Sequence, residues 1–137
     1  IQIANAVGCD RAPGPCEAAV GTNAAALRIE PLKWWLYGVD APDVDEEQGG
    51  ILDISHSRTH IRISGPEATT LLNRHLSLDL REQSFPVGSV ASSMIHHVGV
   101  TLWRSEEGYE LFIPRGFALS LWEGIVESAT QFGVEIV

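Results

Sequence analysis

Histidine is the residue type in this sequence best suited to chemistry, because imidazole binds metal ions and transfers protons near neutral pH. There are five, at His56, His60, His75, His96 and His97. His96 and His97 are neighbours, so on a strand they would point to opposite faces and could not chelate together. His56 and His60 could share a face, but they lack a third ligand at a suitable spacing, and zinc requires three or four. We therefore predict no metal site.

Basic residues recur at every second position between residues 56 and 62. They are His56, Arg58, His60 and Arg62. A strand that begins this early would place all four side chains on one face. Such a face could bind an anion or dock against acidic groups of a partner. Equally, it could face solvent with its arginines paired to nearby acids, as surface ion pairs are common. The sequence leaves both interpretations open.

The sequence contains four tryptophans, and two of them are adjacent. Trp103 and Trp122 lie in patterned elements, and we expect them to be structural. Trp34 and Trp35 would face opposite ways on a strand, so one should enter the core and the other should cover an edge or meet a partner. Protein interfaces are enriched in Trp and Arg. The candidate partner-contacting residues are therefore Trp34, Trp35, Arg58, Arg62 and Arg115.

Two aspartates could be cast as a catalytic acid and base. Asp53 lies in an apolar run and Asp79 in a Leu-Asp-Leu segment. Such a carboxylate more often accepts backbone N–H groups at a turn. The sequence has no G-x-G-x-x-G, P-loop, G-x-S-x-G or H-E-x-x-H motif. We therefore predict no catalytic residue.

The two cysteines lie in the segment CDRAPGPC, at Cys9 and Cys16. Their spacing differs from the C-x-x-C of zinc and redox sites. We interpret them as free thiols of a cytoplasmic protein, although the residues between them could close a disulfide loop. The sequence begins at Ile1 without a Met, so we expect a longer parent chain, and no export signal is visible.

Composition narrows the protein class. A chain of 137 residues is the size of one domain, and it is 45% hydrophobic and 20% charged. Nine basic and eighteen acidic residues give a net charge of −9, which would repel a nucleic acid. No apolar run approaches the ~20 residues of a membrane span. We expect neither nucleic acid nor membrane as a partner.

The elements that must position these residues follow from periodicity. Residues 1–23 are predicted to be an irregular segment with at most a short turn of helix, and residues 40–50 an acidic loop. The predicted strands are residues 24–29, 33–39, 59–63, 89–96, 98–104 and 109–113.

Two helices complete the predicted fold. One should begin at Pro66 and end near His75. The second is marked by a stripe of apolar residues at steps of about four from Phe117 to Phe132, followed by Gly133 as a stop signal. We predict one α+β domain over residues 1–137, with a mostly antiparallel sheet and helices packed on one face.

Several motifs carry a family resemblance. They are LDISHSRTHIRISGPEATTLLNRHLSLDL from Leu52, FPVGS, TLWR, YELFIPRGFALSLWEGIVESA and QFGVEI, with IEPLKWWL upstream. In this order they resemble the gamma subunit family of heterotetrameric sarcosine oxidase, over residues 24–137. The same series is similar to the folate-binding domain of the glycine cleavage T protein, which implies an α+β fold.

The resemblance implies a non-catalytic gamma subunit that supports assembly of a complex which demethylates sarcosine oxidatively to glycine. By that resemblance the partners are the alpha, beta and delta subunits, alpha most directly. FAD, FMN, NAD and tetrahydrofolate are expected on those subunits and no cofactor on this chain. Three alternatives stay open: the small subunit of a related N-methylglutamate dehydrogenase, a stand-alone folate-binding or aminomethyltransferase-like protein, and an independent adaptor.

Overall fold

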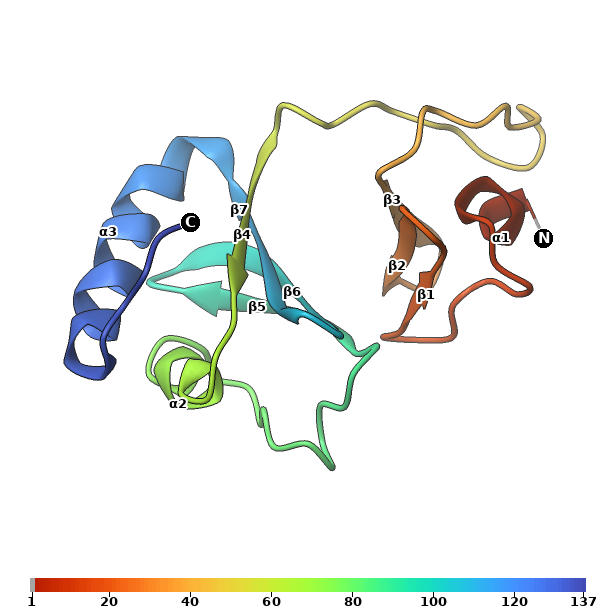
Figure 1. The fold of residues 1–137 in the computed structure, drawn as a ribbon. Helices are drawn as coiled ribbons and strands as arrows, with labels where there is room; N and C mark the ends of the chain where they lie inside the picture. Colours follow the sequence, from red (N-terminus) through yellow and green to blue (C-terminus); the bar gives the residue numbers. More distant parts are fainter. Residues whose placement is uncertain (1) are drawn as a thin grey trace.

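Two antiparallel sheets and three α-helices make up the computed structural model, which describes residues 2–137 (Figure 1). The helices are α1 (Gln2–Val7), α2 (Ala68–Asn73) and α3 (Ala118–Ala129), with 3₁₀ turns at Arg115–Phe117 and Thr130–Phe132. The strands are β1 (Ala18–Val20), β2 (Ala25–Glu30), β3 (Lys33–Tyr37), β4 (Arg58–Ile63), β5 (Val90–Ile95), β6 (Val98–Ser105) and β7 (Gly108–Pro114).

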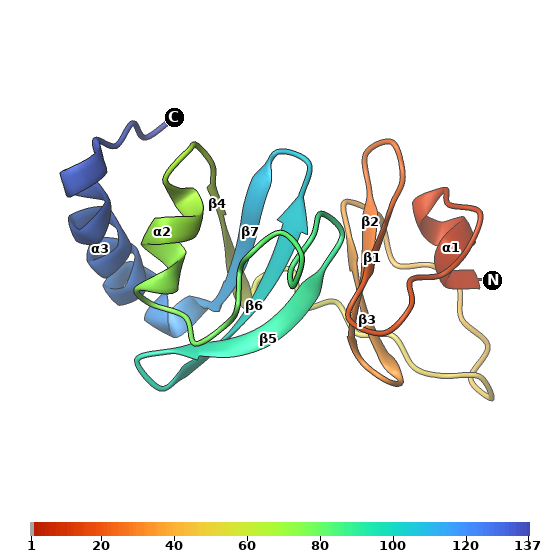
Figure 2. The ribbon, with the colours of Figure 1, turned by 90° about the horizontal axis from the view of Figure 1, so that it is seen from below.

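The larger sheet has the strand order β4-β7-β6-β5 and is covered on one face by α2 and α3 (Figure 2). Alternate residues of its strands point into this main core, where they meet the apolar sides of the helices. On α3 the buried residues are Leu121, Ile125 and Ala129, at four-residue steps. The α+β class with helices on one face of an antiparallel sheet is thus confirmed.

The other face of the larger sheet meets a second sheet, of order β1-β2-β3. Figure 2 shows the layers in sequence: α2 and α3, the larger sheet, the smaller sheet, and α1. The second core between the sheets consists of Ala25, Leu27, Val90, Trp103 and Phe112, with Ala18, Ile29 and Trp35 packed against it. Because β7 is covered on both faces, its interior is almost continuously buried.

The N-terminal segment is more ordered than the sequence suggested. The short helix α1 agrees with the expected turn of helix, and its Ala4 and Val7 are buried. The prediction of an irregular segment is wrong for Ala18–Val20, which forms β1 and pairs with β2. The tripeptide Ala-Ala-Val has weak strand propensity, so its conformation is imposed by the backbone partners on either side.

Three further boundaries differ from the prediction. His96 and His97 form the two-residue turn between β5 and β6, with φ of 48° and 69°, so they do not lie on a strand. Helix α2 is shorter than predicted, because Pro66 and Glu67 form a preceding turn. Phe117 precedes α3 and is 54% exposed, so it does not belong to the buried stripe.

The predicted end of the last helix at Gly133 agrees with the structure, where this residue has φ of 80°. Within residues 2–137, each helix is too short or too polar to cross a membrane.

Candidate functional site

The candidate site is centred on Glu110, a carboxylate in the middle of β7. Its neighbours Tyr109 and Leu111 point into the main core, so Glu110 points the other way, toward the smaller sheet. Its exposed fraction is 0%. A buried carboxylate is costly unless it is ionically paired and hydrogen-bonded, so its partners define the site.

Three side chains donate hydrogen bonds to this carboxylate. Arg62 lies directly opposite Glu110 in the β4–β7 register, and its Nε donates to Oε1 at 2.7 Å. Ser105 Oγ donates to the same oxygen at 2.9 Å. His60 Nε2 donates to Oε2 at 2.5 Å. Arg62 also pairs with Glu107 at 2.5 Å, at the exposed rim.

These contacts keep both members of the central pair charged. Burial, the largest single influence, acts to raise the pKa of Glu110, but the hydrogen bonds from His60, Arg62 and Ser105 together outweigh it and lower this pKa. The hydrogen bond to Glu110 raises the pKa of Arg62. The site is therefore a carboxylate–guanidinium pair at neutral pH, with an imidazole attached.

The smaller sheet closes over the imidazole. The ring of His60 stacks on Phe112 with centroids 4.8 Å apart and planes at 12°. From β3, the hydroxyl of Tyr37 forms a hydrogen bond with His60 Nδ1 at 3.3 Å, and the Tyr37 ring meets Phe112 edge-on. The ionised carboxylate of Glu110 can only accept, so Nε2 of His60 carries a proton. A His–Glu pair can orient a general base, but here both ring nitrogens already have partners within the chain.

The structure places the two adjacent tryptophans on opposite faces of β3, as predicted. Trp35 enters the second core, where it meets Phe112 edge-on at 5.8 Å. Trp34 lies on the other face, with the guanidinium of Arg28 5.4 Å from its ring centroid. Whether Trp34 contacts a partner stays a prediction.

The predicted basic row is only partly formed. His56 lies in the turn before β4, so the row on the strand comprises Arg58, His60 and Arg62. The sequence places four groups in one row only if the strand begins by His56, and this condition is not met because β4 begins at Arg58. His60 and Arg62 pair with acids, as one interpretation held, whereas Arg58 lies over the Trp35 ring at 5.5 Å. Arg115 is exposed just after β7.

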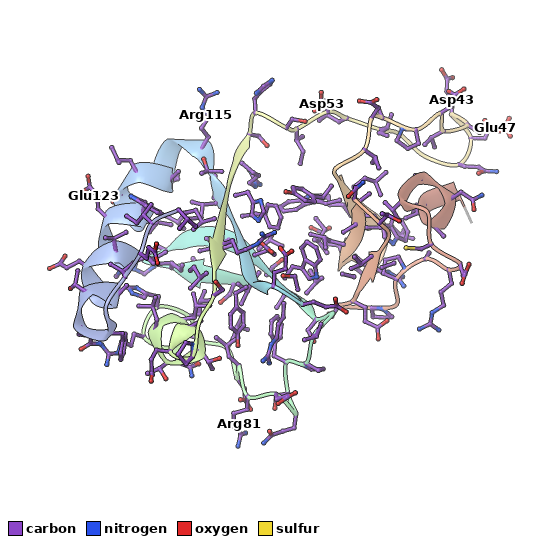
Figure 3. All side chains as sticks on the ribbon, viewed as in Figure 1. Asp43, Glu47, Asp53, Arg81, Arg115 and Glu123 are labelled. Carbon is purple, nitrogen blue, oxygen red and sulfur yellow. The ribbon has the colours of Figure 1, made fainter. Side chains whose placement is uncertain are left out.

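Asp53 and Asp79 each stabilise a turn by accepting hydrogen bonds from residues that follow them in the chain. Asp53 accepts the backbone N–H and the hydroxyl of Ser55, and the hydroxyl contact is the main cause that lowers its pKa. Asp79 accepts from Arg81 and Ser84, and the Arg81 side chain is the main cause that lowers its pKa well below the usual range. Figure 3 shows Asp53 and Arg81 at opposite ends of the molecule, so the two aspartates do not form an acid–base pair.

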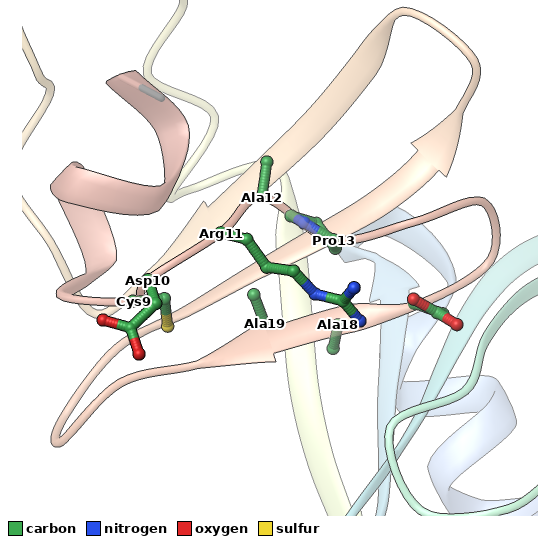
Figure 4. Close-up of a pocket in the computed structure, with 8 residues that line it drawn as sticks. Cys9, Asp10, Arg11, Ala12, Pro13, Ala18 and Ala19 are labelled. Atoms are coloured by element: carbon green, nitrogen blue, oxygen red, sulfur yellow. The ribbon is translucent and has the colours of Figure 1, made fainter.

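Two hollows mark the surface. One, of about 350 Å³, lies between β1 and the segment that follows α1, and it includes Cys9, Asp10 and Arg11 (Figure 4). Cys9 and Cys16 are both free thiols. The other, of about 340 Å³, lies between α3 and the β5–β6 turn and is lined in part by His75 and His96.

The ring centroids of His75 and His96 are 6.2 Å apart, and burial lowers the pKa of His75. Over residues 2–137, no three side chains of His, Cys, Asp or Glu converge as metal ligands would.

The family can now be assigned by comparison. A model of the GCVT N-terminal domain matches residues 21–137. The chain belongs to the GCVT N-terminal domain family. Within this family it is similar to sarcosine oxidase subunit gamma from Corynebacterium sp. (strain P-1), with 28% identity over 93 residues, covering 67% of this chain and 46% of the relative. Subunit gamma from Arthrobacter sp. is 31% identical over 91 residues, covering 66% and 45%.

A second relative and a solved structure extend the likeness. Aminomethyltransferase from Thermoanaerobacter sp. (strain X514) is 28% identical over 120 residues, covering 82% of this chain and 30% of the relative. The structure of heterotetrameric sarcosine oxidase from Corynebacterium sp. U-96, in complex with pyrrole 2-carboxylate, contains a chain with the same fold. It matches with a TM-score of 0.83 and 22% identity, covering 99% of this chain and 75% of that one.

These likenesses confirm the resemblance to the sarcosine oxidase gamma family. The chain spans about half the length of the first two relatives: the match covers 46% of one and 45% of the other. The sequence motifs therefore led to the relatives that the comparison finds, whereas the buried Glu110 was missed. A glutamate inside the apolar run Tyr109–Ile113 was the available signal, because a charged residue between apolar neighbours on a strand is buried only when paired.

Proposed function

We propose that this chain is a non-catalytic, gamma-type subunit of a heterotetrameric sarcosine oxidase and supports assembly of the complex that demethylates sarcosine to glycine. The relatives named sarcosine oxidase subunit gamma support this function. FAD, FMN, NAD and tetrahydrofolate then belong to the alpha, beta and delta subunits, with alpha as the main contact. The subunit would act in the cytoplasm.

The observation that carries the non-catalytic role is the closed network around Glu110. His60, Arg62 and Ser105 donate to its two oxygens, and Tyr37 is hydrogen-bonded to the remaining nitrogen of His60. A general base needs a free lone pair within reach of the substrate. In this chain the buried acid–imidazole pair instead joins the two sheets, so its role is to stabilise the fold.

The test is purification of the tagged chain from its native cell, followed by an absorbance spectrum of the eluate. We expect a large partner to co-elute with flavin bands at about 450 nm, because that partner holds the redox cofactor. Turnover of sarcosine by the eluate supports the proposed complex, whereas turnover of N-methylglutamate alone identifies the related dehydrogenase. A colourless chain that elutes alone contradicts the proposal and leaves the independent adaptor.

A folate-binding, aminomethyltransferase-like function is the second candidate, favoured by the aminomethyltransferase relatives. A folate site needs an aromatic platform and a polar group that fixes the pterin. The aromatic cluster beside Glu110 has this composition. Its rings, however, pack against one another, as Tyr37 does edge-on against Phe112. Titration of the isolated chain with tetrahydrofolate should therefore show no saturable binding. Saturable binding would favour the second candidate.

A further inference from the structure

Two arginines lie at the same end of the larger sheet, one at the start of β4 and one just after β7. Arg58 begins β4 and is paired in register with Pro114, the last residue of β7. Arg115 follows directly, and its backbone N–H donates to the carbonyl of Ser57 at 3.0 Å. The β4–β7 pairing therefore fixes the backbones of the two residues next to each other. Figure 3 shows Arg115 projecting outward at this end.

Both guanidinium groups lack an acidic partner. Among the ion pairs of residues 2–137, the arginines involved are Arg62 and Arg81, and neither Arg58 nor Arg115 takes part. The guanidinium of Arg58 is held over the ring of Trp35 at 5.5 Å, and its one hydrogen bond, to the carbonyl of Ser57, is long at 3.4 Å. Stacking on an aromatic ring orders a guanidinium while its N–H donors stay available for a carboxylate.

The charge of the rest of the chain makes this end distinctive. The net charge is −9, so most of the surface repels an acidic partner. An acidic segment of a partner is attracted to unpaired arginines. The acidic surface around them repels that segment, which disfavours other orientations of the partner. The apolar Phe117 and Leu119, 54% and 70% exposed, follow Arg115 in the chain. Arginine and exposed apolar residues close together in the sequence are compatible with an interface.

We propose that Arg58 and Arg115 bind carboxylates of an acidic segment of the larger partner subunit, and so orient this chain in the complex. This inference rests on the proposed function, which supplies the partner. A guanidinium binds a carboxylate through two parallel N–H···O bonds, so two arginines at one end of the sheet can bind two acidic side chains of a segment that crosses this end.

The first test is charge reversal in the co-purified complex. The variant Arg58→Glu/Arg115→Glu should lower recovery of the flavin-bearing partner at least about tenfold, a loss of about 1.4 kcal/mol or more. The control Arg74→Glu/Arg81→Glu changes the net charge equally at exposed arginines elsewhere and should recover as much partner as the wild type. Arg58→Lys/Arg115→Lys should retain most of the binding. Thermal melts of the three variants establish that each is folded.

The second test identifies the occupant. A photo-crosslinking residue at position 115 of the complex should capture a segment of the larger subunit rich in Asp and Glu. Capture of a neutral or basic segment overturns the proposal. Capture of residues 40–47 from a second copy of this chain also overturns it, because that acidic loop would then be the occupant.

Failure of this inference is distinguishable from failure of the proposed function. If the wild-type chain elutes colourless and alone, the proposed function fails, and the docking proposal fails with it. If the wild type elutes with a coloured partner and the Arg58→Glu/Arg115→Glu variant recovers that partner equally well, only the docking proposal fails.

Discussion

The imidazole of His60 and the carboxylate of Glu110 lie 2.5 Å apart across β4 and β7, and the carboxylate has no exposed surface. Because Tyr37 of the smaller sheet is hydrogen-bonded to the other nitrogen of the imidazole, a chain of hydrogen bonds runs from one sheet to the other. The second core surrounds this chain with apolar side chains. The polar network therefore fixes how the two sheets face each other, which apolar contacts alone specify less sharply.

Substitution of Glu110 should destabilise the protein more than any exposed acid. In Glu110→Gln the carboxylate that pairs with Arg62 and accepts from His60 is lost within a buried site, so we expect the free energy of unfolding to fall by about 3 kcal/mol. The control is Glu107→Gln, because Glu107 also pairs with Arg62 but its side chain is 65% exposed. That variant should lose less than about 1 kcal/mol. Urea denaturation measures both, and equal losses would contradict the central role of Glu110.

The same carboxylate should make stability depend on acid pH. Its pKa in the folded state is lower than the ordinary 4.5, so below about that pH the unfolded chain binds a proton that the folded chain resists. The stabilisation is therefore complete above the unfolded pKa and is lost as the pH falls through the folded one.

Denaturation series between about pH 7 and 3 should accordingly show the gap between wild type and Glu110→Gln narrowing below about pH 4.5. Asp53 and Asp79 also have lowered pKa values, but they are present in both proteins and cancel in this comparison. A gap that stays constant down to pH 3 would mean that the Glu110 carboxylate is not the titrating group.

The sequence predicted those parts of the fold that have a local period. The strand around Ile61 repeats every two residues and the stripe on α3 about every four, and the structure confirms both. Strand β1 has no such period and owes its conformation to β2, a contact between distant residues. The division into two sheets was missed for the same reason, because the strand alternation shows that a face is buried but not what covers it.

Part of the candidate site could be predicted from the sequence. The alternation of His60 and Arg62 on one face was recognised, together with the option that they pair with acids. Their common partner, Glu110, lies about fifty residues further along the chain, and the register that places it opposite Arg62 is set by the whole β4–β7 pairing. Residue spacing alone cannot supply that register.

The smaller sheet should unfold together with the larger one. Leu27 of β2 is fully buried between the sheets, so Leu27→Ala removes packing and leaves a cavity, and we expect a loss of about 3 kcal/mol. Leu32→Ala is the matched control, since Leu32 is 89% exposed and should change stability by less than about 0.5 kcal/mol. Unfolding followed by both tryptophan fluorescence and circular dichroism should give coincident transitions. Two separate transitions in the wild type would show that the sheets unfold independently.

The turn between β5 and β6 should become more stable when glycine replaces its second residue. His97 has φ of 69°, a conformation that glycine adopts without the strain a side chain meets, and Asn-Gly is the preferred pair in such two-residue turns. We expect His97→Gly to raise the free energy of unfolding by about 0.5–1 kcal/mol, measured by urea denaturation. His97→Ala removes the imidazole but keeps the strained backbone, so it should bring no gain. If His97→Gly is instead destabilising, the imidazole of His97 makes a contribution that outweighs the backbone strain.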